Sequence, residues 1–504
     1  MKPWLIAFQV LILSFQTFSV EAKMNHELYV YTGDDNLAHY DFKIQSPVLG
    51  VFNPTVYGLL LNSTDDQELL PGLISEWKYD FKEKKYILTL SNAKFHNGRE
   101  ITAQDLEFSI IRGFISSSEN YNRIHFSDIK GITDLKVGMK YKTGMVPGLK
   151  VLNKKQLQIE LSRTNPIFLL NFTVPFVPLV PEEELKEDYF TWKKWPIGAG
   201  PYRVESDYHD HRLKLIAVKP VADRPTAIIM DNARKVDKYD IIFDEVIASD
   251  KEKDFEKVFS KYPVSIACLA FYRDNPIDQN LNFRKAIYHA IDRDSLAMNT
   301  DQYRAAYEMM VRPYGGRVKP KNPYNVELAK SYLAKVPHEL LKDGVKIGVY
   351  ATDDHWTPAM KQRIARMTEQ FKEIGLKVSF EANSEKFPTP EVVKKYTIKM
   401  YSKVVDLADP AVSYGAMSSR SPYRNENPVK GNEYDLAYEK ALAANDVETR
   451  FHAIQEISTL IEEKAIISPL LQKYAFYRIN PNKVKTLGDQ AKPLFLDLSK
   501  VEMK

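Results

Sequence analysis

The chain has 504 residues, of which 44% are hydrophobic and 27% are charged. This composition is that of a folded globular protein and excludes general disorder, and the length exceeds what one hydrophobic core usually serves. We therefore expect two or three domains. The 70 basic and 66 acidic residues leave a formal charge of +4, and they are interleaved along the chain, so the sequence does not indicate a nucleic-acid partner.

An apolar stretch near the N-terminus runs from Trp4 to Val20 and ends in the small-x-small pattern Val-Glu-Ala. A membrane anchor is the alternative interpretation, but the stretch is short for a spanning helix and two glutamines interrupt it. We predict that residues 1–22 form an export signal that is cleaved after Ala22. No cysteine lies near this site, which disfavours a lipid anchor, so we expect a soluble mature chain.

The first half of the mature chain alternates between strands and helices. Tyr86, Leu88 and Leu90 alternate with polar residues, as in a half-buried strand. Thr102 and Asp105 have the spacing of a capping box, with Asp in place of the usual Glu or Gln, and this predicts the start of a helix. We further expect a hairpin over residues 151–161 and strands over residues 212–219 and 239–247.

The only cysteine, Cys268, lies in the apolar run 264–271, which is typical of a buried strand. A lone cysteine can serve as a catalytic nucleophile, and no intramolecular disulfide is possible with one cysteine. The apolar neighbours favour core packing for Cys268 over a catalytic role.

The second half contains a predicted βαβ unit. Residues 345–350 form the first strand, and Thr357 with Pro358 is typical of an N-cap and first helical residue. Gly375 marks the end of this helix, and residues 376–380 alternate as the next strand. Two further helices are expected near the C-terminus, over residues 434–442 and 450–463. Such units favour an α/β fold with parallel sheet.

Motifs of catalysis are missing from the sequence. It has no G-x-S-x-G elbow, H-E-x-x-H motif, phosphate loop or G-x-G-x-x-G motif. Gly198 and Gly200 precede a proline and a strand, so we interpret them as a tight turn and not as a phosphate site. The segment 207–211 carries two histidines and two aspartates, but its place between two strands favours a solvated turn over a metal site. We expect no cofactor and no bound metal.

Four segments together resemble the oligopeptide- and dipeptide-binding proteins of ABC importers, which are family 5 of the extracytoplasmic solute-binding proteins. The family pattern combines a proline-led segment with a Trp, F-H-N-G, T-A-x-D, G-x-G-P-Y, an R-x-A-x-x-x-A-I-D-R helix and D-Y-x-D-P. Similar residues occur here at Leu69–Trp77 with Lys94–Ser109, at Pro196–Tyr202, at Asn282–Arg293, and at Asp406–Pro410 followed by Tyr434 and Asp435. The resemblance spans roughly residues 28 to 490, and most of these residues taken singly specify fold and not ligand.

The resemblance implies a two-lobed periplasmic binding protein fold of type II, the three-domain oligopeptide-binding type, with a cleft between the lobes. The implied first lobe combines residues 23–55, 196–265 and 477–504 as domain I with an inserted domain II of residues 56–195. Residues 266–476 form the implied second lobe, domain III.

The resemblance also implies a site. In the family, the strand before D-Y-x-D-P holds an extended peptide through its backbone, and the first Asp pairs with the α-ammonium of the peptide. In this chain that strand is Ile398 to Val405, which includes the predicted ligand-binding residues Ser402, Lys403 and Val404, and the acid is Asp406. A buried ammonium needs such a partner because an unpaired charge in a dry cleft is costly.

Two departures from the family pattern bear on the ligand. Ser402 and Lys403 replace the usual Gly-Trp, so Lys403 either adds a positive charge that suits a carboxylate or points to solvent. Cys268 and Ala270 are small where larger residues are common, which predicts a roomier pocket or a non-peptide solute.

The resulting expectation is a monomeric periplasmic binding protein, not an enzyme, that delivers a small solute to the permease of an ABC importer. An oligopeptide is the expected solute. A metal chelate, cell-wall fragment or oligosaccharide is the alternative within the fold, and an exported hydrolase is the alternative from another class.

Overall fold

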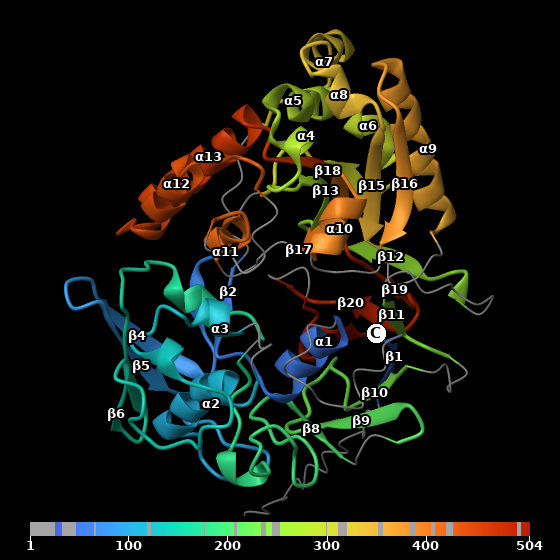
Figure 1. Ribbon diagram of the computed structural model, residues 1–504. Coiled ribbons are helices and arrows are strands. Elements are labelled where there is room, and N and C mark those ends of the chain that lie inside the picture. Colours follow the sequence, from blue (N-terminus) through green and yellow to red (C-terminus); the bar gives the residue numbers. More distant parts are fainter. Residues whose placement is uncertain are drawn as a thin grey trace, which may run out of the picture.

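The structure is a computed structural model, and it describes residues 26–32, 47–64, 67–117, 122–175, 177–205, 209–232, 238–243, 252–298, 300–310, 320–350, 356–383, 389–404, 409–419, 427–490 and 495–504. These residues form two lobes (Figure 1). The first lobe contains strands β1–β12 and β19–β21, and the second contains β13–β18. In the described part of the chain, no helix is long and apolar enough to cross a membrane. The predicted export signal lies outside the described residues.

A seven-stranded mixed sheet organises the first lobe, in the order β12-β19-β11-β1-β10-β9-β8. The central β1 runs parallel to β10 and β11, whereas the other neighbours are antiparallel. The strand expected over residues 212–219 is confirmed as β9, and within 239–247 the described strand is β11. The strands are β1 (Glu27–Tyr31), β8 (Tyr202–Val204), β9 (Arg212–Ala217), β10 (Ala227–Asp231), β11 (Ile241–Phe243), β12 (Glu256–Phe259) and β19 (Phe476–Ile479), with a separate pair β20 (Val484–Thr486) and β21 (Glu502–Met503).

A four-stranded antiparallel sheet, in the order β4-β5-β7-β6, forms the inserted part of the first lobe. The predicted hairpin and the predicted half-buried strand are confirmed as β6–β7 and β5, whose burial alternates along the strand. The strands are β2 (Leu61–Ser63), β3 (Leu69–Pro71), β4 (Ile74–Asp80), β5 (Lys85–Leu90), β6 (Leu149–Asn153) and β7 (Gln156–Glu160). The helices of this lobe are α1 (Pro47–Val56), α2 (Ala103–Ile115), α3 (Asn122–His125) and the 3₁₀ turns η2 (Ile132–Asp134), η3 (Phe168–Phe172), η4 (Glu182–Glu184) and η7 (Leu498–Lys500).

One hydrophobic core joins the two sheets of the first lobe. Leu28 of β1 and Leu88 of β5 belong to the same cluster of buried residues, and neither has exposed surface. A shared core resists bending between its parts, because interiors are packed as densely as crystals. The first lobe is therefore one packed unit, and bending is expected where the chain leaves it.

The second lobe contains a six-stranded mixed sheet in the order β14-β18-β13-β17-β15-β16. The predicted βαβ unit is confirmed: β15 and β16 are parallel, and Thr357 caps helix α9 by accepting a hydrogen bond from Met360 N–H. Gly375 has a φ of +83°, a left-handed conformation that glycine adopts at little cost. The strands are β13 (Ser265–Phe271), β14 (Tyr303–Ala305), β15 (Val345–Tyr350), β16 (Val378–Asn383), β17 (Ile398–Val404) and β18 (Ile467–Lys473).

Helices cover both faces of this sheet (Figure 1). One face packs on a cluster that includes Phe283 of α5 and Phe371 of α9, and the other on a cluster that includes Tyr414 of α11 and Ile454 of α13. The two helices predicted near the C-terminus are confirmed as α12 and α13. The helices are α4 (Pro276–Gln279), α5 (Leu281–Ala290), α6 (Arg293–Ala297), α7 (Val326–Leu333), α8 (His338–Leu341), α9 (Pro358–Glu373), α10 (Pro390–Lys395), α11 (Pro410–Gly415), α12 (Glu433–Leu442) and α13 (Val447–Glu463).

The chain bends at residues 199–201 of the G-x-G-P-Y segment, and close packing gives a further reason for its glycines. A Cβ at Gly198 would lie 2.1 Å from the carbonyl oxygen of Val56, and one at Gly200 would lie 2.7 Å from the amide nitrogen of Gly58. Neither glycine has a positive φ. The end of α1 therefore packs directly on this backbone, and any side chain there would push the two segments apart.

The predicted domain boundaries lie close to the borders between the sheets but do not coincide with them. The four-stranded sheet lies within residues 56–195, whereas the boundary at 265/266 falls within β13 and the boundary at 476/477 falls within β19. The assignment of these segments as domains I, II and III stays a prediction.

Candidate functional site

Two adjacent segments connect the lobes and form a hinge, which we define as residues 260–264 and 473–475. On the first-lobe side β12 pairs with β19, and on the second-lobe side β13 pairs with β18. Between these ladders the hydroxyl of Ser260 accepts a hydrogen bond from Ala475 N–H (3.1 Å) and donates one to the carbonyl of Tyr262 (2.8 Å). Backbone bonds from Ser260 N–H to the carbonyl of Ala475 and from Val264 N–H to the carbonyl of Lys473 (2.8 Å each) also join the two segments. A side chain thus replaces one bond of the ladder where the chain passes between the lobes, and we infer that bending occurs here.

The lobes touch one another through apolar side chains. Val174, which follows η3 in the first lobe, is buried in the cluster that contains Cys268, Met417 and Ile454 of the second lobe. Phe495 of the first lobe packs against the same cluster. Because only 3% of Val174 is exposed, separating the lobes would expose apolar surface to water.

A polar cluster lies beside this apolar contact. In the first lobe Asp128 forms an ion pair with Arg163 (2.6 Å) and accepts a hydrogen bond from Asn165. Tyr438 of α12 lies near this pair and near Asp409 of the second lobe. Burial, with a further contribution from Asp409, raises the pKa of Tyr438 to about 12. The hydroxyl therefore stays protonated and neutral at physiological pH.

The end of β17 carries three of the predicted site residues. The ladder of β17 with β13 continues to Val404, whereas the described ladder with β15 covers only Ile398–Met400. The side chain of Ser402 is exposed, and that of Val404 is 51% exposed. The ammonium of the half-buried Lys403 donates a hydrogen bond to the carbonyl of Ser413 in α11. The two alternatives for Lys403, a charge facing the ligand and a side chain facing solvent, both stay predictions.

Cys268 and Ala270 lie on β13 beside β17, opposite Tyr401 and Lys399. Both are buried, with 0% and 1% exposure, in the cluster under α11, α12 and α13. The thiol of Cys268 is 3.7 Å from the carbonyl oxygen of Tyr401. The interpretation of Cys268 as a core residue agrees with this placement, and the idea that the small side chains enlarge a ligand pocket stays a prediction.

The D-Y-x-D-P segment contains two aspartates. Asp406, the predicted ammonium partner, lies outside the described residues. Asp409 caps α11 by accepting from Ala411 N–H (2.9 Å) and forms a buried ion pair with Arg450 of α13 (2.6 Å). Asp409 is therefore a structural residue that attaches α11 to α13.

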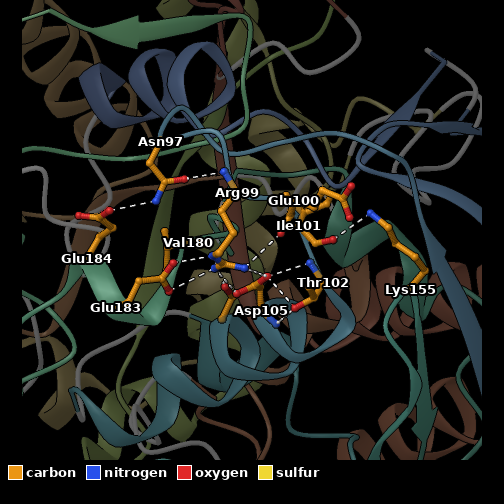
Figure 2. Close-up of polar contacts among 11 residues, drawn as sticks. Asn97, Arg99, Glu100, Ile101, Thr102, Asp105, Lys155, Val180, Glu183 and Glu184 are labelled. Carbon is orange, nitrogen blue, oxygen red and sulfur yellow. Dashed lines mark hydrogen bonds and ion pairs between the residues drawn. The ribbon is translucent and has the colours of Figure 1, made fainter.

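Residues of the F-H-N-G and T-A-x-D segments form a polar network within the first lobe (Figure 2), in which Asn97 donates to Glu184 of η4. Asp105 accepts from the N–H and the hydroxyl of Thr102 (2.7 Å each), which completes the predicted capping box. Arg99 binds both oxygens of Asp105 and also pairs with Glu183 of η4. These side chains bind one another and hold η4 against α2, which confirms a role in folding for this motif.

Sequence reasoning missed the hinge, Val174 and Tyr438. The hinge had a local signal, because Lys261, Tyr262 and Pro263 interrupt two runs of strand-forming residues. The sequence gives no such signal for Val174 or Tyr438, because each is an ordinary apolar or aromatic residue whose contacts are with residues far along the chain. Of the segment 207–211, for which a metal site was considered, residues 207 and 208 lie outside the described residues, so the interpretation as a solvated turn stays a prediction.

Two α/β lobes, a two-segment hinge and an apolar contact between the lobes define a hinged binding protein. Over residues 68–425 the chain matches the model of the bacterial extracellular solute-binding proteins, family 5. The chain belongs to this family. The recognition and the fold class predicted from the sequence are thereby confirmed.

Two curated relatives come from Bacillus subtilis. The oligopeptide-binding protein OppA is 25% identical over 67% of this chain and 66% of its own length. The oligopeptide-binding protein AppA is 23% identical over 60% of this chain and 57% of its own length. The aligned part thus spans somewhat less than two thirds of each relative.

Solved structures share the fold over nearly their whole length. The ABC transporter substrate-binding protein CtaP from Listeria monocytogenes matches with a TM-score of 0.76 and 17% identity, covering 95% of this chain and 99% of that one. OppA from Haemophilus influenzae in complex with the peptide RPPGFSPFR matches with a TM-score of 0.71 and 16% identity, covering 95% and 99%. NikA from Brucella suis in complex with Fe(III)-EDTA matches with a TM-score of 0.74 and 16% identity, covering 95% and 100%.

Proposed function

We propose that the protein captures an oligopeptide between its lobes outside the cytoplasmic membrane and delivers it unchanged to the permease of an ABC importer. The family match over residues 68–425 carries the proposal, since this family consists of solute-binding proteins. The names of the two Bacillus relatives favour a peptide among the possible solutes. The lobe contact at Val174 supports a mechanism in which closure buries the ligand.

The end of β17 is the proposed peptide-binding strand. The exposed Ser402 and Val404 lie beyond the part of β17 that pairs with β15, so an extended peptide could add its backbone there. Asp406, two residues further along, is the proposed partner of the peptide ammonium. Lys403, which binds α11 in this structure, is the proposed source of positive charge near a ligand carboxylate.

The cellular setting is part of the same proposal. The mature protein would begin at Lys23, after cleavage of an export signal, and would work as a periplasmic monomer without catalytic activity. N-terminal sequencing of protein from the cell envelope fraction tests the cleavage. An intact Met1, or a protein that stays with membranes after a salt wash, would contradict it.

The experiment that tests the ligand class is mass spectrometry of the solute retained after gentle purification. A peptide released intact by mild denaturation is the expected result. A metal chelate such as the one bound by NikA, or an oligosaccharide, would instead establish a family member for a non-peptide solute. Peptide fragments that accumulate with time during incubation would indicate a hydrolase.

A further inference from the structure

A cavity of about 200 Å³ lies at the hinge, and we refer to it as the hinge pocket. Among the described residues, its walls come from the end of β12, from β19 and from residues 487–490 and 495–496. Tyr477, Leu487 and Leu496 are almost completely buried, so they form its floor, and Phe259 and Phe495 are half-buried at its sides. The exposed Lys261 and Asp489 lie at its rim.

The hinge pocket borders the contact between the lobes. Phe495 lines it and also packs against the apolar cluster of the second lobe. Ser260 and Lys261, which line it as well, belong to the hinge. In Figure 1, β12 and β20 lie at the level where the two lobes meet. A side chain of a ligand that is held between the lobes could therefore occupy this pocket.

The lining indicates what the pocket accepts. Ser260 has both of its hydrogen bonds within the hinge, and the amide of Gln490 donates to the carbonyls of Leu487 and Asp497 while accepting from Asp497 N–H. These two polar side chains are therefore already engaged by the protein itself. A charged group on the apolar floor would lose its water without gaining a partner.

The size of the pocket selects among apolar groups. A dry apolar cavity of about 150 Å³ is known to accept benzene. The hinge pocket, at about 200 Å³, is large enough for a benzyl or indole group and too small for a peptide of several residues. Among the residues that the structure describes, the rim carries both a cation, Lys261, and an anion, Asp489, so neither sign of charge is excluded from the neighbouring peptide residues.

We propose that the hinge pocket binds one aromatic side chain of the ligand and so determines sequence preference at one position of the bound peptide. This inference rests on the proposed peptide-binding function for the identity of the chain that carries the aromatic group. Burial of such a side chain is worth about a ten- to hundredfold gain in affinity over alanine.

The test is calorimetry on a series of alanine-based pentapeptides in which a single Phe is moved through the five positions. The proposal predicts that one position binds about ten- to hundredfold more tightly than the all-alanine peptide. Val258→Trp fills the pocket from its half-buried wall on the edge strand β12, and it should abolish the Phe preference while retaining the affinity for the all-alanine peptide. Val218→Trp, on an exposed surface of the same lobe, is the matched control and should retain the preference.

Fluorine NMR with 5-fluoroindole separates failure of the pocket from failure of the proposed function. The fluorine signal of the probe should broaden when wild-type protein is added and should sharpen again when the preferred Phe peptide displaces the probe. The probe should bind the Val258→Trp variant weakly. If that variant does not fold, the competition between probe and peptide in the wild type provides the test. If the probe binds at this site but no peptide binds the protein, the proposed peptide-binding function is wrong, whereas the proposal that the hinge pocket binds aromatic groups still holds. Equal affinity for Phe and Ala at every position, or a preference unchanged in Val258→Trp, would overturn the hinge pocket.

Discussion

The imidazole of His96 joins two segments that are about a hundred residues apart: its Nε2 lies 3.0 Å from the carbonyl oxygen of Gly200, and Gly198 N–H donates to its Nδ1 (3.3 Å). Since Nδ1 accepts, the proton of the neutral ring is on Nε2, which donates to Gly200. His96 N–H also donates to the carbonyl of Gly198 (2.8 Å). The F-H-N-G and G-x-G-P-Y segments are thus two halves of one structural joint in the first lobe.

This joint predicts a dependence of stability on pH. Burial is the main cause that lowers the pKa of His96 below 6.5, and a protonated Nδ1 would face the N–H of Gly198. The unfolded chain therefore binds this proton at higher pH than the folded chain does. The contribution of His96 to stability is complete above pH 6.5 and is lost as the pH falls from there through the lowered pKa.

Replacement of His96 by Gln measures that contribution. Gln cannot titrate, so the free energy of unfolding in urea should fall less between pH 7.5 and pH 5 in His96→Gln than in the wild type. His338→Gln, at an exposed position, should keep the slope of the wild type. If the free energy of unfolding depends on pH identically in His96→Gln and in the wild type, the joint does not favour the neutral form of the His96 imidazole.

A second prediction tests the structural role of Asp409, the second aspartate of the D-Y-x-D-P segment. Asp409→Asn leaves Arg450, which is 1% exposed, as a buried charge without its counter-ion, and should cost about 3–5 kcal/mol of unfolding free energy. Glu456→Gln breaks the exposed ion pair with Lys440 and should cost at most about 1 kcal/mol. Urea denaturation of both variants is the measurement, and similar small losses would contradict a structural role for Asp409.

A third prediction concerns Asp406 as the partner of the ligand ammonium. Asp406→Asn should weaken peptide binding by at least ~2 kcal/mol, about thirtyfold, because a charge-assisted hydrogen bond is lost. N-acetylation of the peptide should cost a similar amount with the wild type and little more with the variant, since both changes break the same pair. Calorimetry on the four combinations gives the answer, and equal affinity of the wild type for free and acetylated peptide would remove Asp406 from the site.

A fourth prediction addresses closure of the lobes. Val174→Ala removes apolar surface that packs in the cluster of the second lobe, which should lower peptide affinity about tenfold and increase the radius of gyration in small-angle X-ray scattering. Val137→Ala, in the same lobe but 51% exposed, is the control. Unchanged affinity and scattering for Val174→Ala would mean that this contact does not stabilise the closed form.

Elements set by local pattern were predictable from the sequence, and contacts between distant segments were not. The strand β15, the cap Thr357 and the helix α9 follow from hydrophobic periodicity and capping over short windows. The bond between Ser260 and Ala475, by contrast, joins residues that are 215 positions apart. No local pattern indicates such a contact, because it depends on how the finished lobes are placed.

The candidate site shows the same division. The position of Ser402–Val404 at the end of a strand followed from the motif and the apolar pattern of β17, and the structure places them there. The contact of Lys403 with the carbonyl of Ser413 did not, since it depends on the direction in which α11 leaves the sheet. The close packing at Gly198 was not predicted for a similar reason: its close neighbour, Val56, is remote in the chain.

The most direct test of the central claim is a thermal-shift experiment on the mature protein with pools of tri- to pentapeptides, followed by mass spectrometry of the recovered peptides. A solute that binds only the native state adds about 2.7 kcal/mol of stability at a hundredfold excess over Kd. The account predicts that at least one peptide pool raises the melting temperature and that its peptides are recovered intact. A melting temperature that responds to a metal chelate or a sugar but to no peptide pool, or recovery of shortened peptides, would contradict it.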